Sequence, residues 1–88
     1  MVVIALNENN ETISIDAFFA KYIEFSYNQK MVEQTTRILK LFLRHPDAIE
    51  ELADKIDEKY AFSVFGTNRP YTVVFKTTNR SIILVDIW

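Results

Sequence analysis

Few residues in this sequence could do chemistry. His45 is the only histidine, Gly66 is the only glycine, and there is no cysteine. The lack of cysteine excludes thiol nucleophiles, Cys-ligated zinc, iron–sulfur clusters and disulfides. The single glycine excludes glycine-rich phosphate-binding loops. His45 precedes Pro46, where a helix should end and where a cationic side chain favours the helix dipole. We therefore predict no catalytic residue, no metal site and no cofactor.

Carboxylate pairs are the remaining route to acid–base catalysis. Asp16, Glu24 and Asp86 are scattered along the chain, and no pattern brings two of them together. We predict a protein that is not an enzyme.

Half of the twelve acidic residues lie in one short segment, which is the first candidate binding surface: Asp47, Glu50, Glu51, Asp54, Asp57 and Glu58. With Lys55 and Lys59 the segment carries −4, so the rest of the chain carries +2 of the total of −2. Helical spacing of the acids predicts an acidic helix over 47–58, about 16 Å long at 1.5 Å per residue. Such a face can imitate a nucleic-acid backbone or dock on a basic surface. A merely solvated helix face is the alternative interpretation.

A basic strip is the second candidate surface and could bind phosphates. It comprises Arg37, Lys40 and Arg44 on a predicted helix, with Arg69 and Arg80 in the predicted turns near the end of the chain. The net charge of −2 makes nucleic acid an unlikely partner. Tyr71 and Trp88 are the aromatic side chains expected to anchor a protein partner.

Three helical segments are predicted to position these residues. Asp16 is a candidate N-cap for a helix over 17–26, and a break is expected at 26–28. Apolar residues on one face predict a second helix over 29–44, which His45-Pro46 ends. Asp47 with Glu50 forms a variant of the capping box that begins the third, acidic helix.

The remaining segments are predicted to be strands. Residues 1–15 form a β-hairpin around the turn Asn7-Glu8-Asn9-Asn10. Strands over 61–65, 71–77 and 81–87 form a C-terminal three-stranded antiparallel meander. The unbroken apolar run 82–85 predicts a central strand, covered on both faces or buried in a dimer. The expected fold is a single α+β domain over 1–88, with helices on one face of the sheet.

The segments 69–75 and 81–88 resemble the final strands of RelE/ParE-type bacterial toxins. The resemblance covers about 20 of the 88 residues. It implies cleavage of mRNA at the ribosome or poisoning of gyrase, with Arg69, Tyr71 and Arg80 as the nearest functional positions.

The sequence therefore supports three hypotheses of function. The preferred hypothesis is a non-enzymatic inhibitor of phage or plasmid type, whose acidic helix engages the basic, nucleic-acid-binding surface of a host protein. The alternatives are a RelE/ParE-like toxin and a homodimeric structural domain that pairs through 81–88. No apolar run approaches the roughly 18 residues of a membrane span, so a cytoplasmic location is expected.

Overall fold

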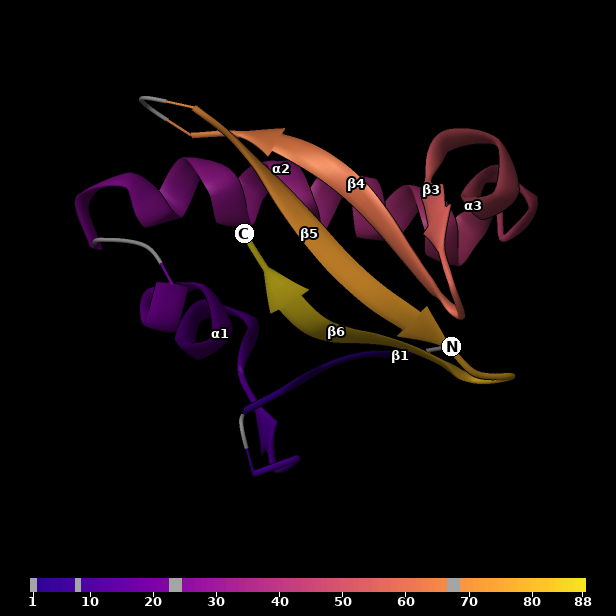
Figure 1. The fold of residues 1–88 in the computed structure, drawn as a ribbon, viewed down its shortest axis with the longest axis horizontal. Helices are drawn as coiled ribbons and strands as arrows, with labels where there is room; N and C mark the ends of the chain where they lie inside the picture. The colour runs from indigo at the N-terminus through magenta and orange to yellow at the C-terminus, as the bar shows by residue number, and fades with distance from the viewer. Residues whose placement is uncertain (1, 8, 23–24, 67–68) are drawn as a thin grey trace.

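The computed structural model describes residues 2–7, 9–22, 25–66 and 69–88, which form three helices and six strands (Figure 1). In chain order these are β1 (Val2–Leu6), β2 (Thr12–Ile13), α1 (Ile15–Tyr22), α2 (Phe25–Arg44), α3 (Asp47–Leu52), β3 (Asp54–Ile56), β4 (Lys59–Phe65), β5 (Pro70–Thr77) and β6 (Ser81–Ile87). The predicted α+β class is confirmed. All three C-terminal strands occur where expected, within two residues.

The strands form one mixed sheet in the order β2-β1-β6-β5-β4-β3. The pair β1 and β6 is parallel, and every other pair is antiparallel. A three-stranded antiparallel meander is therefore a wrong description, because β4, β5 and β6 are only the middle of a larger sheet. The apolar strand β6 is central, as predicted, since β1 pairs with one of its edges and β5 with the other.

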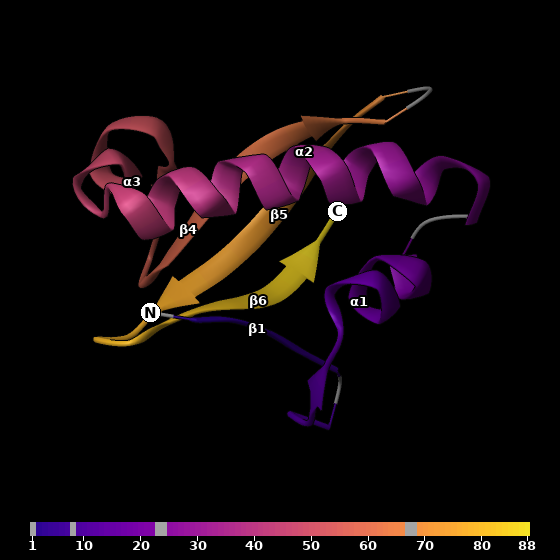
Figure 2. The same ribbon diagram turned by 180° about the vertical axis from the view of Figure 1, so that it is seen from behind.

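The helix α2 crosses one face of the sheet, behind it in Figure 1 and in front of it in Figure 2. Met31, Thr35, Leu39 and Phe42 recur at helical spacing along α2, and all four are at most 2% exposed. They pack with Phe18 and Phe19 of α1 and with the inward side chains of the sheet in one hydrophobic cluster. The helices therefore lie on one face, as expected.

The N-terminal elements begin and end differently from the prediction. The hydroxyl of Ser14 accepts a hydrogen bond from the amide of Ala17 at 3.0 Å, so Ser14 caps α1 in place of Asp16. The helix therefore starts at Ile15 and leaves β2 only two residues. The break expected at 26–28 lies inside α2, which begins at Phe25. The link between the two helices, 23–24, lies outside the described residues.

The prediction of an acidic helix over 47–58 is wrong. Helix α3 ends at Leu52, because Ala53 turns to extended backbone at φ −101° and ψ 145°. The chain then forms a hairpin of β3 and β4, in which Ile56 pairs with Lys59. Asp57 occupies the intervening turn with φ at 56°, a left-handed conformation that Asp tolerates better than most residues.

Packing against the sheet explains this difference. The ring of Tyr60 stacks on that of Phe75 with centroids 5.6 Å apart and planes at 22°. That contact requires Tyr60 to lie on a strand paired with β5, where it stands opposite Phe75. The capping box is absent as well, because Pro46 is the N-cap residue and makes no side-chain cap.

Candidate interaction surfaces

The six acidic residues still lie close together, although on two kinds of element. Asp47, Glu50 and Glu51 belong to α3, and Asp54, Asp57 and Glu58 belong to the β3–β4 hairpin. We call these six residues the acidic end. Figure 1 shows α3 and β3 at the same end of the molecule. All six side chains are exposed. The predicted line of charge along one helix is thus replaced by a broader acidic surface.

A hydrogen bond ties the two parts of the acidic end together. The Tyr60 hydroxyl on β4 donates to Oε1 of Glu50 on α3 at 2.5 Å. The Lys55 ammonium lies 5.9 Å from the centre of the Tyr60 ring. Tyr60 is thus held on one side by Phe75 and at its tip by Glu50. This contact fixes the hairpin relative to α3, and sequence patterns had no signal for it.

The same contact makes a prediction for alkaline pH. The hydrogen bond to Glu50, partial burial and the negative charge of Glu50 raise the pKa of Tyr60 above its ordinary value of 10.0. The folded state therefore holds this proton more tightly than the unfolded state does. The resulting stabilisation is complete below the unfolded pKa and is lost as pH rises through the folded pKa. Phenolate absorbance should show a late step, in which one tyrosine ionises above the ordinary value of 10.0.

Two variants identify that tyrosine. Tyr60→Phe should remove the late step, and Glu50→Gln should shift it back toward the ordinary value, because the charged acceptor is gone. A late step that persists in Tyr60→Phe would assign it to another tyrosine.

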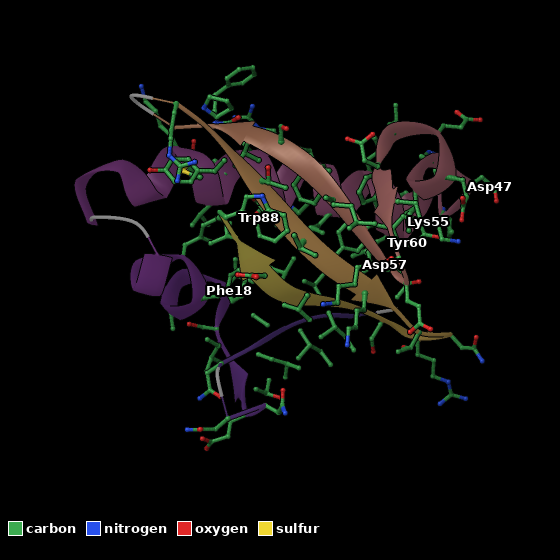
Figure 3. All side chains as sticks on the ribbon, in the orientation of Figure 1. Phe18, Asp47, Lys55, Asp57, Tyr60 and Trp88 are labelled. Atoms are coloured by element: carbon green, nitrogen blue, oxygen red, sulfur yellow. The ribbon has the colours of Figure 1, made fainter. Side chains whose placement is uncertain are left out.

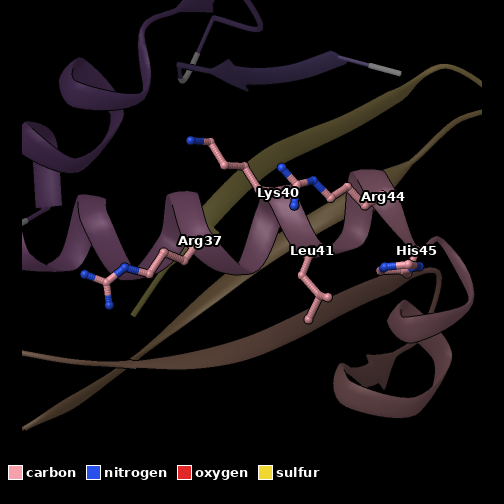
Figure 4. Close-up of a pocket in the computed structure, with 5 residues that line it drawn as sticks. All are labelled: Arg37, Lys40, Leu41, Arg44 and His45. Atoms are coloured by element: carbon pink, nitrogen blue, oxygen red, sulfur yellow. The ribbon is translucent and has the colours of Figure 1, made fainter.

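The structure brings together only part of the basic strip. Arg37, Lys40, Leu41, Arg44 and His45 line a shallow hollow of about 260 Å³ at the end of α2 (Figure 4). None of the three basic residues forms an ion pair with a carboxylate in the described part of the chain. Lys40 and Arg44 are one turn apart on the same helix face, where like charges repel. The sole histidine thus lies among cations rather than beside a nucleophile.

Arg69 and Arg80 do not join this hollow, and they do not join each other. Arg69 immediately precedes β5, where its guanidinium lies 3.8 Å from the centre of the Tyr71 ring. Arg80 lies beyond the other end of β5, in the turn before β6. An eight-residue strand separates them, which corresponds to about 26 Å at the rise of an extended chain. Of the three positions implied by the toxin resemblance, Arg69 and Tyr71 are therefore in contact, whereas Arg80 lies apart from them.

Gly66 faces the same aromatic ring as Arg69. A β-carbon at this position would lie 2.5 Å from Cε2 of Tyr71. The amide of Gly66 also donates to the carbonyl of Arg69 at 3.0 Å. The single glycine is therefore used for a close approach to Tyr71, which packs against the core rather than projecting as an anchor.

Trp88 lies at a different place from Tyr71. It follows β6 and exchanges two backbone hydrogen bonds with Thr72, at 2.7 and 3.0 Å. Its side chain remains 52% exposed. It projects on the face of the sheet that α2 leaves uncovered, and Figure 3 labels it at the end of β6. Sequence analysis singled out Trp88, and it predicted from the apolar run in β6 a strand covered on both faces or buried in a dimer. In the structure α2 covers only one of these faces.

Within the described residues, no group of three or more His, Asp or Glu side chains is placed to hold a metal ion. None of the helices there combines the length and apolar character needed to cross a membrane.

Comparison with known proteins gives no match for this chain: no protein-family model matches it, and no match is found among curated proteins or solved structures.

Proposed function

We propose that this chain is a small, non-enzymatic protein-binding module of the phage or plasmid inhibitor type, which engages a basic, nucleic-acid-binding surface of a host protein through its acidic end. The observation that carries the proposal is the acidic end itself. Its six carboxylates are exposed, and none of them forms an ion pair within the described chain. A partner can therefore reach all of them.

Electrostatics favours a basic partner over a neutral one. The segment that forms the acidic end carries −4, whereas the rest of the chain carries +2. Such an asymmetric charge distribution orients a positively charged partner before contact and speeds association. The bond from Tyr60 to Glu50 holds α3 against the hairpin, so the carboxylates are presented on a braced surface.

The absence of enzymatic activity is part of the same proposal. The only histidine lies in the hollow with Arg37, Lys40 and Arg44. The other residues that line the hollow are three cations and one leucine, so none of them could serve as its nucleophile or orient the imidazole as a carboxylate would.

Charge reversal tests the proposal. The tagged protein would be used to capture partners from a lysate at low and at high salt. Glu51→Lys with Glu58→Lys should reduce capture at low salt by at least about tenfold and flatten its salt dependence, because rim charges set attraction and steering. Both side chains are exposed and neither contacts the core, so the fold should be retained.

The matched control reverses two acids outside the acidic end. Glu11→Lys with Glu33→Lys changes the net charge by the same amount at two exposed positions, and it should leave capture nearly unchanged. Equal losses in the two variants would show a response to net charge alone and would refute a specific acidic surface.

A further inference from the structure

One face of the sheet carries no helix. Figure 1 looks onto this face, and α2 lies behind it. In Figure 2, seen from the other side, α2 covers the strands. An antiparallel sheet of a monomer often leaves one face in water, but that face is then polar. Whether the side chains on the uncovered face are polar or apolar therefore indicates whether that face contacts water or a partner.

The strand register places side chains on this face in rows. Ala61 lies opposite Val74, which lies opposite Asp86. Ser63 lies opposite Thr72, which is paired with Trp88 by backbone hydrogen bonds. Partners directly opposite in a sheet share a face, so each row lies on one side.

A third row completes the face. Ile4 of β1 lies opposite Ile83 of β6, and Ile83 lies opposite Lys76 of β5. A register shift between Val74 and Phe75 places one extra residue in β6. For that reason Ile83 and Asp86 lie on the same face although an even number of steps does not separate them.

The uncovered face is rich in apolar side chains. Five large apolar side chains of the described chain are strongly exposed, and Ile56, Phe65 and Trp88, three of these five, project on this side. The chain exposes 5963 Å² in total, whereas a globular monomer of its mass exposes about 5,400 Å². Ala61 and Val74, which lie between these three side chains on the same face, are only 3% and 2% exposed. Large apolar side chains exposed together on one face are typical of a site of protein association.

The charges on the face distinguish a second copy from other partners. Among the paired strand residues that the structure describes, four with charged side chains lie on it: Asp54, Lys59, Lys76 and Asp86. Their sum is zero, so the face offers no attraction to a strongly charged partner. Asp86 and Lys76 lie near each other across β5 and β6 without forming an ion pair. A two-fold axis that runs between them in the interface brings each Lys76 over the Asp86 of the other copy.

We propose that two copies of this chain pack through their uncovered sheet faces, with the helices on the outside. The four central strands span about 19 Å by 24 Å, from strand spacings of about 4.8 Å and a rise of about 3.4 Å. Two such faces bury about 900 Å² before the relief of the side chains is counted, which is below the roughly 1,200 Å² of standard specific interfaces and corresponds to a weak dimer that dissociates on dilution. Sheets that pack in this way lie about 10 Å apart.

This dimer differs from strand pairing through 81–88. Both edges of β6 are already used by β1 and β5, so β6 contributes its face and not its edge. The acidic ends remain outside the interface apart from Asp54, so a dimer presents two of them.

Sedimentation equilibrium over a micromolar concentration series tests the proposal. The wild-type protein should sediment as a dimer that dissociates on dilution. Trp88 is the only tryptophan, and its emission should move to longer wavelength as it becomes exposed. Asp86→Lys should weaken the dimer by at least about tenfold, because Lys76 of one copy then faces a lysine of the other. Adding Lys76→Asp should restore it.

Further variants keep the test decisive. Glu33→Lys, on the exposed side of α2, is the control and should leave the dimer intact. Phe65→Asp replaces a side chain that is 73% exposed and should dissociate the dimer without unfolding the chain, which circular dichroism would check. A wild-type protein that stays monomeric throughout the series would overturn the proposal, as would a dimer unaffected by both Asp86→Lys and Phe65→Asp. Neither result depends on the acidic end, so the proposed function is tested separately.

Discussion

Replacing Phe75 with alanine should lower the free energy of unfolding by about 3–5 kcal/mol. Phe75 is fully buried on β5. Its ring centroid lies 5.7 Å from those of Phe42 and Phe62, and 5.6 Å from that of Tyr60. One substitution therefore removes contacts to α2 and β4 together. A chain of 88 residues has a free energy of unfolding of about 4–13 kcal/mol, so much of its stability should be lost.

Urea denaturation followed by circular dichroism measures this loss. Leu52→Ala is the matched control, because Leu52 is apolar but 61% exposed at the end of α3. The control should change stability by less than about 0.5 kcal/mol. A loss of less than about 1 kcal/mol in Phe75→Ala would contradict a central role for this ring.

Replacing Thr35 with valine should have the opposite sign and stabilise the fold by about 1–2 kcal/mol. Thr35 is 0% exposed on the sheet-facing side of α2. Its hydroxyl oxygen has no hydrogen-bond partner. A buried hydroxyl without a partner has lost its hydration and gained nothing in return. Valine has nearly the same shape, and it replaces the hydroxyl by a methyl group that suits the surrounding core.

The same urea titration compares this variant with Thr36→Val. Thr36 is the next residue of α2, and its side chain is partly exposed. Substituting it should change the free energy of unfolding by less than about 0.5 kcal/mol, because its hydroxyl is not withdrawn from water to the same extent. If Thr35→Val lowered the stability instead, the hydroxyl would have to be bonded in solution.

Local patterns predicted much of the fold correctly. The strand over 81–87 has the predicted bounds, and the strands over 61–65 and 71–77 differ by at most two residues. These segments are rich in β-branched and aromatic residues and are separated by turn residues, so the signal lies within each segment. The second helix ends at Arg44 as predicted, because Pro46 restricts the residue before it.

The segment after Asp47 shows where such patterns fail. Ile49, Leu52 and Ile56 have helical spacing, which is typical of side chains buried along one face of a helix. In the structure only Ile49 is buried, whereas Leu52 is 61% and Ile56 41% exposed. The same residues also fit a short helix followed by a hairpin. The stacking of Tyr60 on Phe75 selects the hairpin, and tertiary contacts of this kind override weak local preferences.

The candidate surfaces were likewise only partly predictable from the sequence. The acidic residues could be identified from composition and remain close together because they are near in sequence. Their arrangement on α3 and the hairpin could not, since it depends on β4 pairing with β5. Arg69 and Arg80 were grouped with the basic strip by charge, but β5 holds them at its opposite ends.

The sequence by itself determined the α+β class, the positions of the C-terminal strands, the second helix and the acidic composition of residues 47–58, because each of these depends on neighbouring residues. Only the tertiary structure decided the parallel pairing of β1 with β6, the hairpin after α3 and the uncovered face that carries Trp88. Each of these depends on contacts between segments distant in the chain. Hydrophobic burial stabilises the arrangement in which these distant segments pack best, and no single segment specifies that arrangement.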